Sequence, residues 1–62
     1  MKEYQIWCKS TINNEEKMFW CKSIYQKWDE EDYPYKRRAK RIFKLYSESN
    51  KAENRKFYLL EE

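Results

Sequence analysis

Residues 7–23 read WCKSTINNEEKMFWCKS, in which the four letters WCKS stand at both ends. Between the repeats lies the polar stretch TINNEE of residues 11–16, and asparagine tolerates the positive φ that tight hairpin turns need. This pattern predicts a β-hairpin whose two arms carry similar side chains. The turn is centred either on Asn13 and Asn14 or on Asn14 and Glu15, and the rest of the fold is expected to form around it.

Alternation of side chains along the two arms sorts them onto two faces, and both turn centres give the same sorting. One face is expected to form the core, and its members are Tyr4, Ile6, Cys8, Phe19, Cys21, Ser23 and Tyr25. The other face is expected to stay open and carries Gln5, Trp7, Lys9, Met18, Trp20, Lys22, Ile24 and Gln26. Two Trp residues with Met and Ile form an apolar patch, which is typical of an interface.

An amphipathic helix is expected over residues 33–49. The acidic run DEED of residues 29–32 suits a helix N-terminus, both as a source of capping side chains and as a complement to the helix dipole, and Pro34 is tolerated in the first turn. At a helical period, one arc carries apolar side chains: Tyr35, Ala39, Ile42, Phe43 and Tyr46. The opposite arc is basic and consists of Lys36, Arg37, Lys40, Arg41 and Lys44.

The order of these elements predicts an α+β fold of the ββαβ type, formed by residues 1–62 as a single domain. A short strand is expected over residues 55–60, after a polar loop. One helix covers only one face of a three-stranded sheet, so its apolar arc is expected to pack on the face of Ile6 and Phe19. A right-handed crossover directs the last strand parallel to the second and beside the first, which gives a mainly antiparallel sheet with the first strand in the centre.

The composition argues against catalysis and against a cofactor. The 62 residues include no His and no Gly, and the usual acid-base and nucleophile constellations cannot be assembled from the rest. Cys8 and Cys21 cannot complete the four-ligand set of structural zinc, so no metal is expected. We interpret both as small buried hydrophobic residues in a reduced cytosol, with a cross-strand disulfide as the alternative.

Size and hydropathy set two further expectations. A chain this short buries only about 60% of the surface that its unfolded form exposes, so its stability is marginal without a partner. The start MKEY lacks the apolar run of a signal peptide, and no stretch is apolar enough to cross a membrane. We therefore expect a cytoplasmic protein with no membrane partner.

Two surfaces are candidates for binding. The open hairpin face offers Trp7, Met18, Trp20 and Ile24 as apolar anchors with Lys9 and Lys22 at the rim, an arrangement typical of a face that binds a foreign protein or a second copy in a homodimer. The alternative is a nucleic acid bound by the basic arc of the helix, that is by Lys36, Arg37, Lys40, Arg41 and Lys44. Protein contact is favoured because the aromatic residues and the basic arc are expected on opposite sides of the molecule.

The chain also resembles a known class of small proteins. Its MKEY start, its helix of the Tyr-x-x-x-Ala-x-x-Ile-Phe-x-x-Tyr kind and its final FYLLEE strand are similar to those of the ββαβ accessory proteins made by phages of low-GC Gram-positive bacteria. The resemblance implies a protein that acts by binding, either to inhibit a host or defence enzyme, to sequester a component or to block a nucleic-acid site. We expect a non-catalytic inhibitor or modulator of a host or anti-phage defence protein, located in the host cytoplasm.

Overall fold

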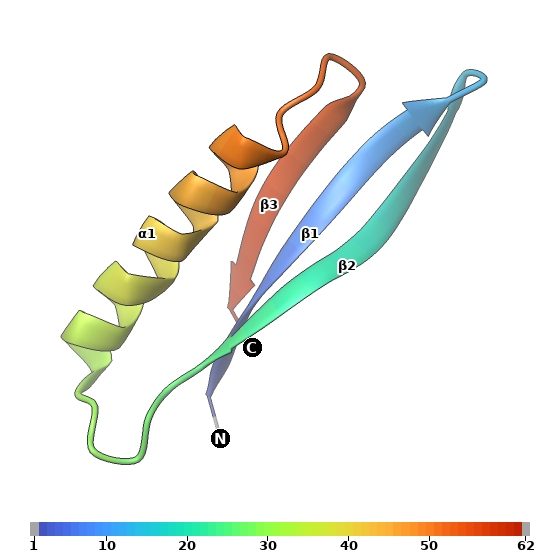
Figure 1. Cartoon of the computed structure of the whole chain (residues 1–62). Helices are drawn as coiled ribbons and strands as arrows, with labels where there is room; N and C mark the ends of the chain where they lie inside the picture. The colour runs from blue at the N-terminus through green and yellow to red at the C-terminus, as the bar shows by residue number, and fades with distance from the viewer. Residues whose placement is uncertain (1, 62) are drawn as a thin grey trace.

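The computed structural model describes residues 2–61 and contains three strands and one helix. In chain order these are β1 (Glu3–Ile12), β2 (Glu15–Tyr25), α1 (Asp32–Ser49) and β3 (Arg55–Glu61) (Figure 1). β1 lies between β2 and β3 and pairs antiparallel with both, so β3 runs in the same direction as β2. The α+β, ββαβ fold with a central first strand is therefore confirmed. Met1 and Glu62, which belong to the domain expected at 1–62, lie outside the described residues.

The hairpin turn follows the first of the two expected centres. Asn13 and Asn14 have φ angles of 53° and 66°, and Ile12 pairs with Glu15 across the turn. A two-residue loop with positive φ at both positions matches the right-handed twist of the strands that it joins. Asparagine makes this conformation accessible in a chain that has no glycine.

A β-bulge in β2 changes which side chains share a face. Ile6 pairs with Lys22 but Trp7 pairs with Trp20, so Cys21 is an extra residue without an opposite partner on β1. An extra residue moves every later side chain of the strand to the other face. Beyond the bulge, the expected sorting of residues 22–25 is therefore wrong.

The corrected faces beyond the bulge are clear from pairing and burial. Ile24 pairs with Tyr4 and is only 3% exposed, so it belongs to the core and not to the open face. Lys22 pairs with Ile6 on the helix side of the sheet. Ser23 and Tyr25, both expected in the core, lie on the open face, where Tyr25 is exposed.

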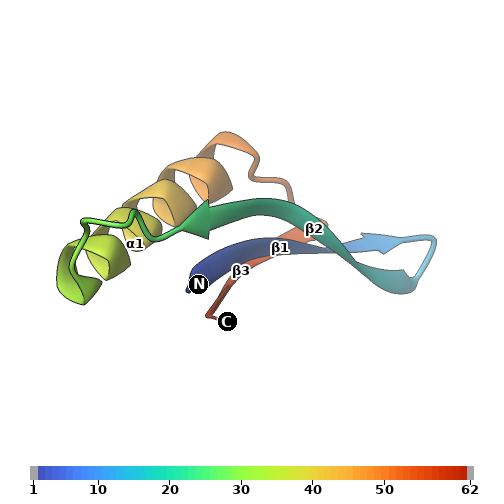
Figure 2. The ribbon, with the colours of Figure 1, turned by 90° about the horizontal axis from the view of Figure 1, so that it is seen from below.

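The core lies between α1 and the face of the sheet that carries Ile6 (Figure 2). Its buried members are Tyr4, Ile6, Ile24, Tyr35 and Ala39, and its partly buried members include Ile42, Phe43, Tyr46, Phe57 and Leu59. The rings of Tyr4 and Tyr35 are 5.0 Å apart, and the Tyr35 hydroxyl donates a 3.1 Å hydrogen bond to the Ile24 carbonyl oxygen. The apolar arc expected for the helix is thus the arc that packs on the sheet.

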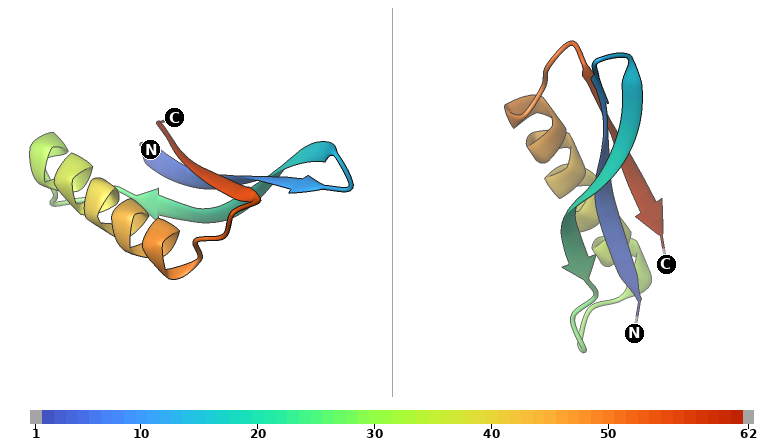
Figure 3. Two further views of the ribbon diagram at one scale, coloured as in Figure 1. Left: turned by 90° about the horizontal axis from the view of Figure 1, so that it is seen from above. Right: turned by 90° about the vertical axis from the view of Figure 1, so that its right-hand side faces the viewer.

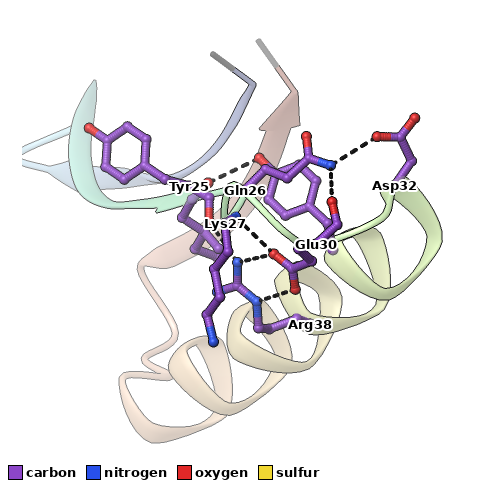
Figure 4. Close-up of polar contacts among 8 residues, drawn as sticks. Tyr25, Gln26, Lys27, Glu30, Asp32 and Arg38 are labelled. Atoms are coloured by element: carbon purple, nitrogen blue, oxygen red, sulfur yellow. Dashed lines mark hydrogen bonds and ion pairs between the residues drawn. The ribbon is translucent and has the colours of Figure 1, made fainter.

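The acidic run before α1 holds the helix through a contact with Arg38 and not through the side-chain cap that is expected from the sequence. Glu31 occupies the N-cap position without a side-chain cap, although its carbonyl oxygen accepts the Tyr35 N–H at 3.1 Å. Glu30 instead accepts two hydrogen bonds from the Arg38 guanidinium, at 2.9 and 2.8 Å, and Arg38 also donates to the Tyr25 carbonyl oxygen at 2.6 Å (Figure 4). These bonds fasten the first half of α1 to the end of β2.

The molecule is elongated, and the hairpin extends beyond the helix (Figures 1 and 3). Its radius of gyration is 13.1 Å, whereas about 11 Å is typical of a compact domain of this length. The uncovered part of the hairpin explains a second correction: Phe19 was expected in the core beneath the helix but is 47% exposed. A large share of both sheet faces is therefore open to a partner.

Candidate protein-binding face

An aromatic row crosses the open face of the sheet at right angles to the strands. Trp7 of β1 pairs with Trp20 of β2 on one side and with Tyr58 of β3 on the other. Directly paired residues place their side chains on the same face of a sheet. We call these three residues, Trp20, Trp7 and Tyr58, the aromatic row.

Hydrogen bonds within the chain fix both indole rings of the row. Trp7 Nε1 donates to Gln5 Oε1 at 2.9 Å, and Trp20 Nε1 donates to Ser23 Oγ at 3.1 Å. Since both indole N–H groups are satisfied internally, the ring surfaces that remain exposed are apolar. Rings held in this way lose less conformational freedom when a partner covers them.

Other apolar side chains widen the row into a patch. Met18 and Leu60 are exposed large residues next to the row on this face, and the exposed Tyr25 lies one same-face position beyond Leu60, opposite Glu3. Lys56 extends over the Tyr58 ring, with its Nζ 5.7 Å from the ring centroid. The patch therefore has an aromatic centre and a mixed apolar and polar surround.

The charges of the open face balance one another. Its strand positions carry two carboxylates, Glu3 and Glu16, and two ammonium groups, Lys9 and Lys56. Lys9 Nζ lies 2.8 Å from Glu16 Oε2, and this hydrogen bond and charge raise the pKa of Lys9. The face consequently has no excess positive charge for attracting a phosphate backbone.

The structure brings together four of the six residues expected in the protein-binding set and separates the other two. Trp7, Lys9, Met18 and Trp20 share the open face. Ile24 is buried in the core, and Lys22 lies beside Ile42 and Leu45 on the helix side, so neither belongs to this patch. The bulge is the physical reason in both cases.

Sequence reasoning missed the contribution of β3 and of the end of β2 to this face. Alternation along residues 55–60 places Lys56, Tyr58 and Leu60 on one side of the last strand, but only the register shows which side that is. Tyr25 was missed because the bulge gives no clear signal in the sequence.

The basic stripe lies on the other side of the molecule. Its five members, Lys36, Arg37, Lys40, Arg41 and Lys44, are all exposed on the surface of α1 that faces away from the sheet. Among residues 2–61, the ion pairs are Lys2 with Asp32, Lys9 with Glu16 and Arg38 with Glu30, so none involves the stripe. Arg37 extends over the Tyr33 ring at 5.7 Å, which is the stripe's aromatic contact within that part of the chain.

The two cysteines are free thiols on the helix side of the sheet. Cys8 is buried and Cys21, the extra residue of the bulge, is half-buried. The neighbouring Cys21 thiol, together with burial, raises the pKa of Tyr46.

Three further findings concern metal ions, membranes and similarity to known proteins. No group of three or more His, Cys, Asp or Glu side chains within residues 2–61 is placed to hold a metal ion. In the same residues, no helix has the length and apolar character needed to span a membrane. Comparison of the chain with protein-family models, with curated proteins and with solved structures finds no match.

Proposed function

We propose that this chain is a non-catalytic binding protein whose open sheet face contacts a partner protein. The observation that carries the proposal is the aromatic row, Trp20, Trp7 and Tyr58, with its indole rings fixed by internal hydrogen bonds. Trp and Tyr dominate the residues that supply most of the energy of protein interfaces. In line with the phage-type resemblance, the partner is a host or anti-phage defence protein that the chain inhibits or modulates.

The layout of the face supports a protein partner. A central cluster of large rings, surrounded by polar groups that exclude water, is the usual anatomy of a specific interface. Here the row is flanked by Met18 and Leu60, and by the Lys9–Glu16 ion pair at the polar edge. An ion pair that is already satisfied does not oppose docking by repelling charges on the partner.

The alternative, nucleic-acid binding by the basic stripe, is less well supported. Binding of single-stranded nucleic acid combines positive charge with aromatic rings on which bases stack. Figure 2 shows that α1 lies on one side of the sheet. The basic stripe is on the outer surface of α1, whereas the aromatic row is on the opposite face of the sheet, where the charges balance. One strand of nucleic acid cannot contact both surfaces without wrapping around the molecule.

Pull-down from a host lysate with matched variants tests the proposal. The wild type should retain a protein that Trp20→Ser loses, because the serine removes the exposed ring from the centre of the face. Lys40→Gln, on the basic stripe, serves as the control and should retain the same protein. Circular dichroism checks that both variants fold. Equal capture by Trp20→Ser, or loss by Lys40→Gln alone, would contradict the assignment to the open face.

A further inference from the structure

A second apolar surface lies on the helix side of the sheet, where α1 moves away from β2. The first half of α1 is fastened to the end of β2 by Arg38 and Tyr35, whereas Tyr46 in its last half packs edge-on against Phe57 of β3, with ring centroids 5.8 Å apart. α1 therefore crosses the sheet obliquely. Two hollows of about 350 and 310 Å³ open beside its last half, and both are lined by Tyr46 and Asn50. We call the combined surface the wedge groove.

The wedge groove combines exposed apolar side chains with basic ones. Leu45 on its helix wall is 59% exposed, and Ile12 and Phe19 on its hairpin wall are exposed to a similar degree. The charged residues lining the two hollows are Lys22 and Arg55, and no carboxylate lines either hollow within the described residues. An apolar ligand that carries negative charge complements this surface.

The loop between β2 and α1 has the opposite character. Trp28 is 97% exposed, the most exposed large hydrophobic side chain in the described part of the molecule. Asp29 and Glu31 follow it in the chain and take part in none of the ion pairs within residues 2–61, which engage Glu30 and Asp32 instead. Lys27 adds one positive charge to this segment, but the two free carboxylates outnumber it. We call residues 26–31 the Trp28 loop.

The loop cannot reach the part of the groove around Tyr46 in its own chain. It precedes the first turn of α1, and Tyr46 lies fourteen residues further along the helix than Asp32, which is about 21 Å at the rise of an α-helix. The loop also lies at the end of the molecule opposite the hairpin turn (Figure 1). Because α1 is a rigid spacer between the two features, only another molecule can bring them together.

We infer that a second copy of this chain covers the wedge groove, with the Trp28 loop of each copy seated in the groove of the other. A two-fold axis across the long direction of the molecule sets the two copies antiparallel and forms both contacts at once, as a closed isologous dimer requires. The contact buries Trp28 and pairs Asp29 and Glu31 with Lys22 and Arg55. It leaves the open face free, so it does not depend on the function proposed above.

Charge reversal provides the decisive test. The groove-reversed variant carries Lys22→Glu and Arg55→Glu, and the loop-reversed variant carries Asp29→Lys and Glu31→Lys. Each variant alone places like charges at both contacts of the dimer, so each should sediment as a monomer of 8.0 kDa, half the mass of the wild-type dimer. In an equimolar mixture both contacts regain opposite charges, and a heterodimer of twofold greater mass should form. The control Lys36→Glu with Lys40→Glu changes the net charge as the groove-reversed variant does, but on the basic stripe, and should remain a dimer.

The fluorescence of Trp28 provides a second measurement that needs no charge change. With Trp7→Phe and Trp20→Phe, Trp28 is the only tryptophan, and it can be excited at a wavelength that the six Tyr residues do not absorb. Its emission should shift to the blue and lose quenching by iodide as the protein is concentrated into the dimer. The inference is overturned if the wild type stays a monomer up to millimolar concentration, or if Trp28 remains fully quenchable in a dimer. It is also overturned if both reversed variants are folded by circular dichroism but their equimolar mixture forms no heterodimer. A dimer that Trp20→Ser dissociates would place the self-contact on the open face instead.

Discussion

At the scale of single residues, Cys21 determines which side chains are available to a partner. Because it is inserted without an opposite residue, Ile24 enters the core and Tyr25 reaches the open face. The regular hairpin expected from the sequence would have exposed Ile24 and buried Tyr25. The bulged register is the one that places an aliphatic side chain, and not a phenol, under Tyr35, whose hydroxyl bonds to the Ile24 carbonyl oxygen.

Truncation of Ile24 tests this assignment. Ile24→Ala should lower the free energy of unfolding by about 2–5 kcal/mol, the usual cost of removing a buried aliphatic side chain. The matched variant Tyr25→Ser, one residue away on the open face, should change it by only about 0.5 kcal/mol or less, as exposed positions do. Urea unfolding followed by circular dichroism measures both. If Tyr25→Ser proves the more damaging change, the hairpin has the regular register and the bulge is wrong.

Glu30 should make the stability of the fold depend on pH, because its environment changes the pKa of its carboxyl group. Hydrogen bonds from Arg38 lower the pKa of the Glu30 carboxyl from 4.5 to about 2. The folded state therefore holds Glu30 deprotonated more strongly than the unfolded state does. Its contribution to stability should be complete above pH 4.5 and should disappear as the pH falls toward about 2.

Urea unfolding at a series of acidic pH values measures this contribution. The stability of the wild type should fall more steeply than that of Glu30→Gln across that window, because the amide does not titrate. Glu48→Gln, at the other end of α1, is the matched control and should keep the wild-type slope. Parallel curves for the wild type and Glu30→Gln would show that the pair with Arg38 does not stabilise the fold in solution.

At the scale of elements, the sequence predicts the helix and the turn well because each has a strong local signal. The apolar arc of α1 has a helical period, and paired asparagines favour a two-residue turn. The bulge could not be predicted because it has no local signal in the sequence, and the core position that it gives Ile24 depends on Tyr35 of α1, which is distant in the chain. The same holds for Tyr58 and Leu60, whose place on the open face depends on the register of β3 with β1.

The basic stripe of α1 gives a prediction that separates the two proposed functions. Arg37, Lys40 and Lys44 can all be replaced by Gln with little change in helix propensity. The triple variant should therefore fold normally and bind its protein partner as the wild type does. A phosphate-binding stripe would instead make the wild type lose affinity for nucleic acid roughly a thousandfold between about 50 and 200 mM salt for about six contacts.

Filter binding or fluorescence anisotropy with single-stranded and double-stranded oligonucleotides, at several salt concentrations, measures this dependence. We expect only weak, non-specific binding by the wild type. Nanomolar binding at physiological salt that the triple variant loses would favour the stripe over the aromatic row. Circular dichroism of the triple variant ensures that any loss reflects charge and not unfolding.

At the scale of the whole molecule, the thin and elongated shape separates the two proposed contacts. The molecule extends 45 × 20 × 12 Å, and the open face and the wedge groove lie on opposite sides of one sheet. The core is small, so a partner that covers exposed apolar surface beside it raises the stability of the fold. Such a surface lies on the side where the helix leaves part of the sheet uncovered. A second copy in the wedge groove does this and still leaves both aromatic rows of the dimer accessible.

This arrangement predicts the composition of the complete complex. A wild-type dimer should bind two partner molecules, one on each open face, whereas the monomeric loop-reversed variant, Asp29→Lys with Glu31→Lys, should bind one with similar affinity per site. Sedimentation of mixtures of known ratio, together with calorimetric titration of the isolated partner, gives both stoichiometries. If the loop-reversed variant is folded but no longer binds, the open face alone does not form the binding site, and the partner must contact the Trp28 loop or span both copies of the dimer.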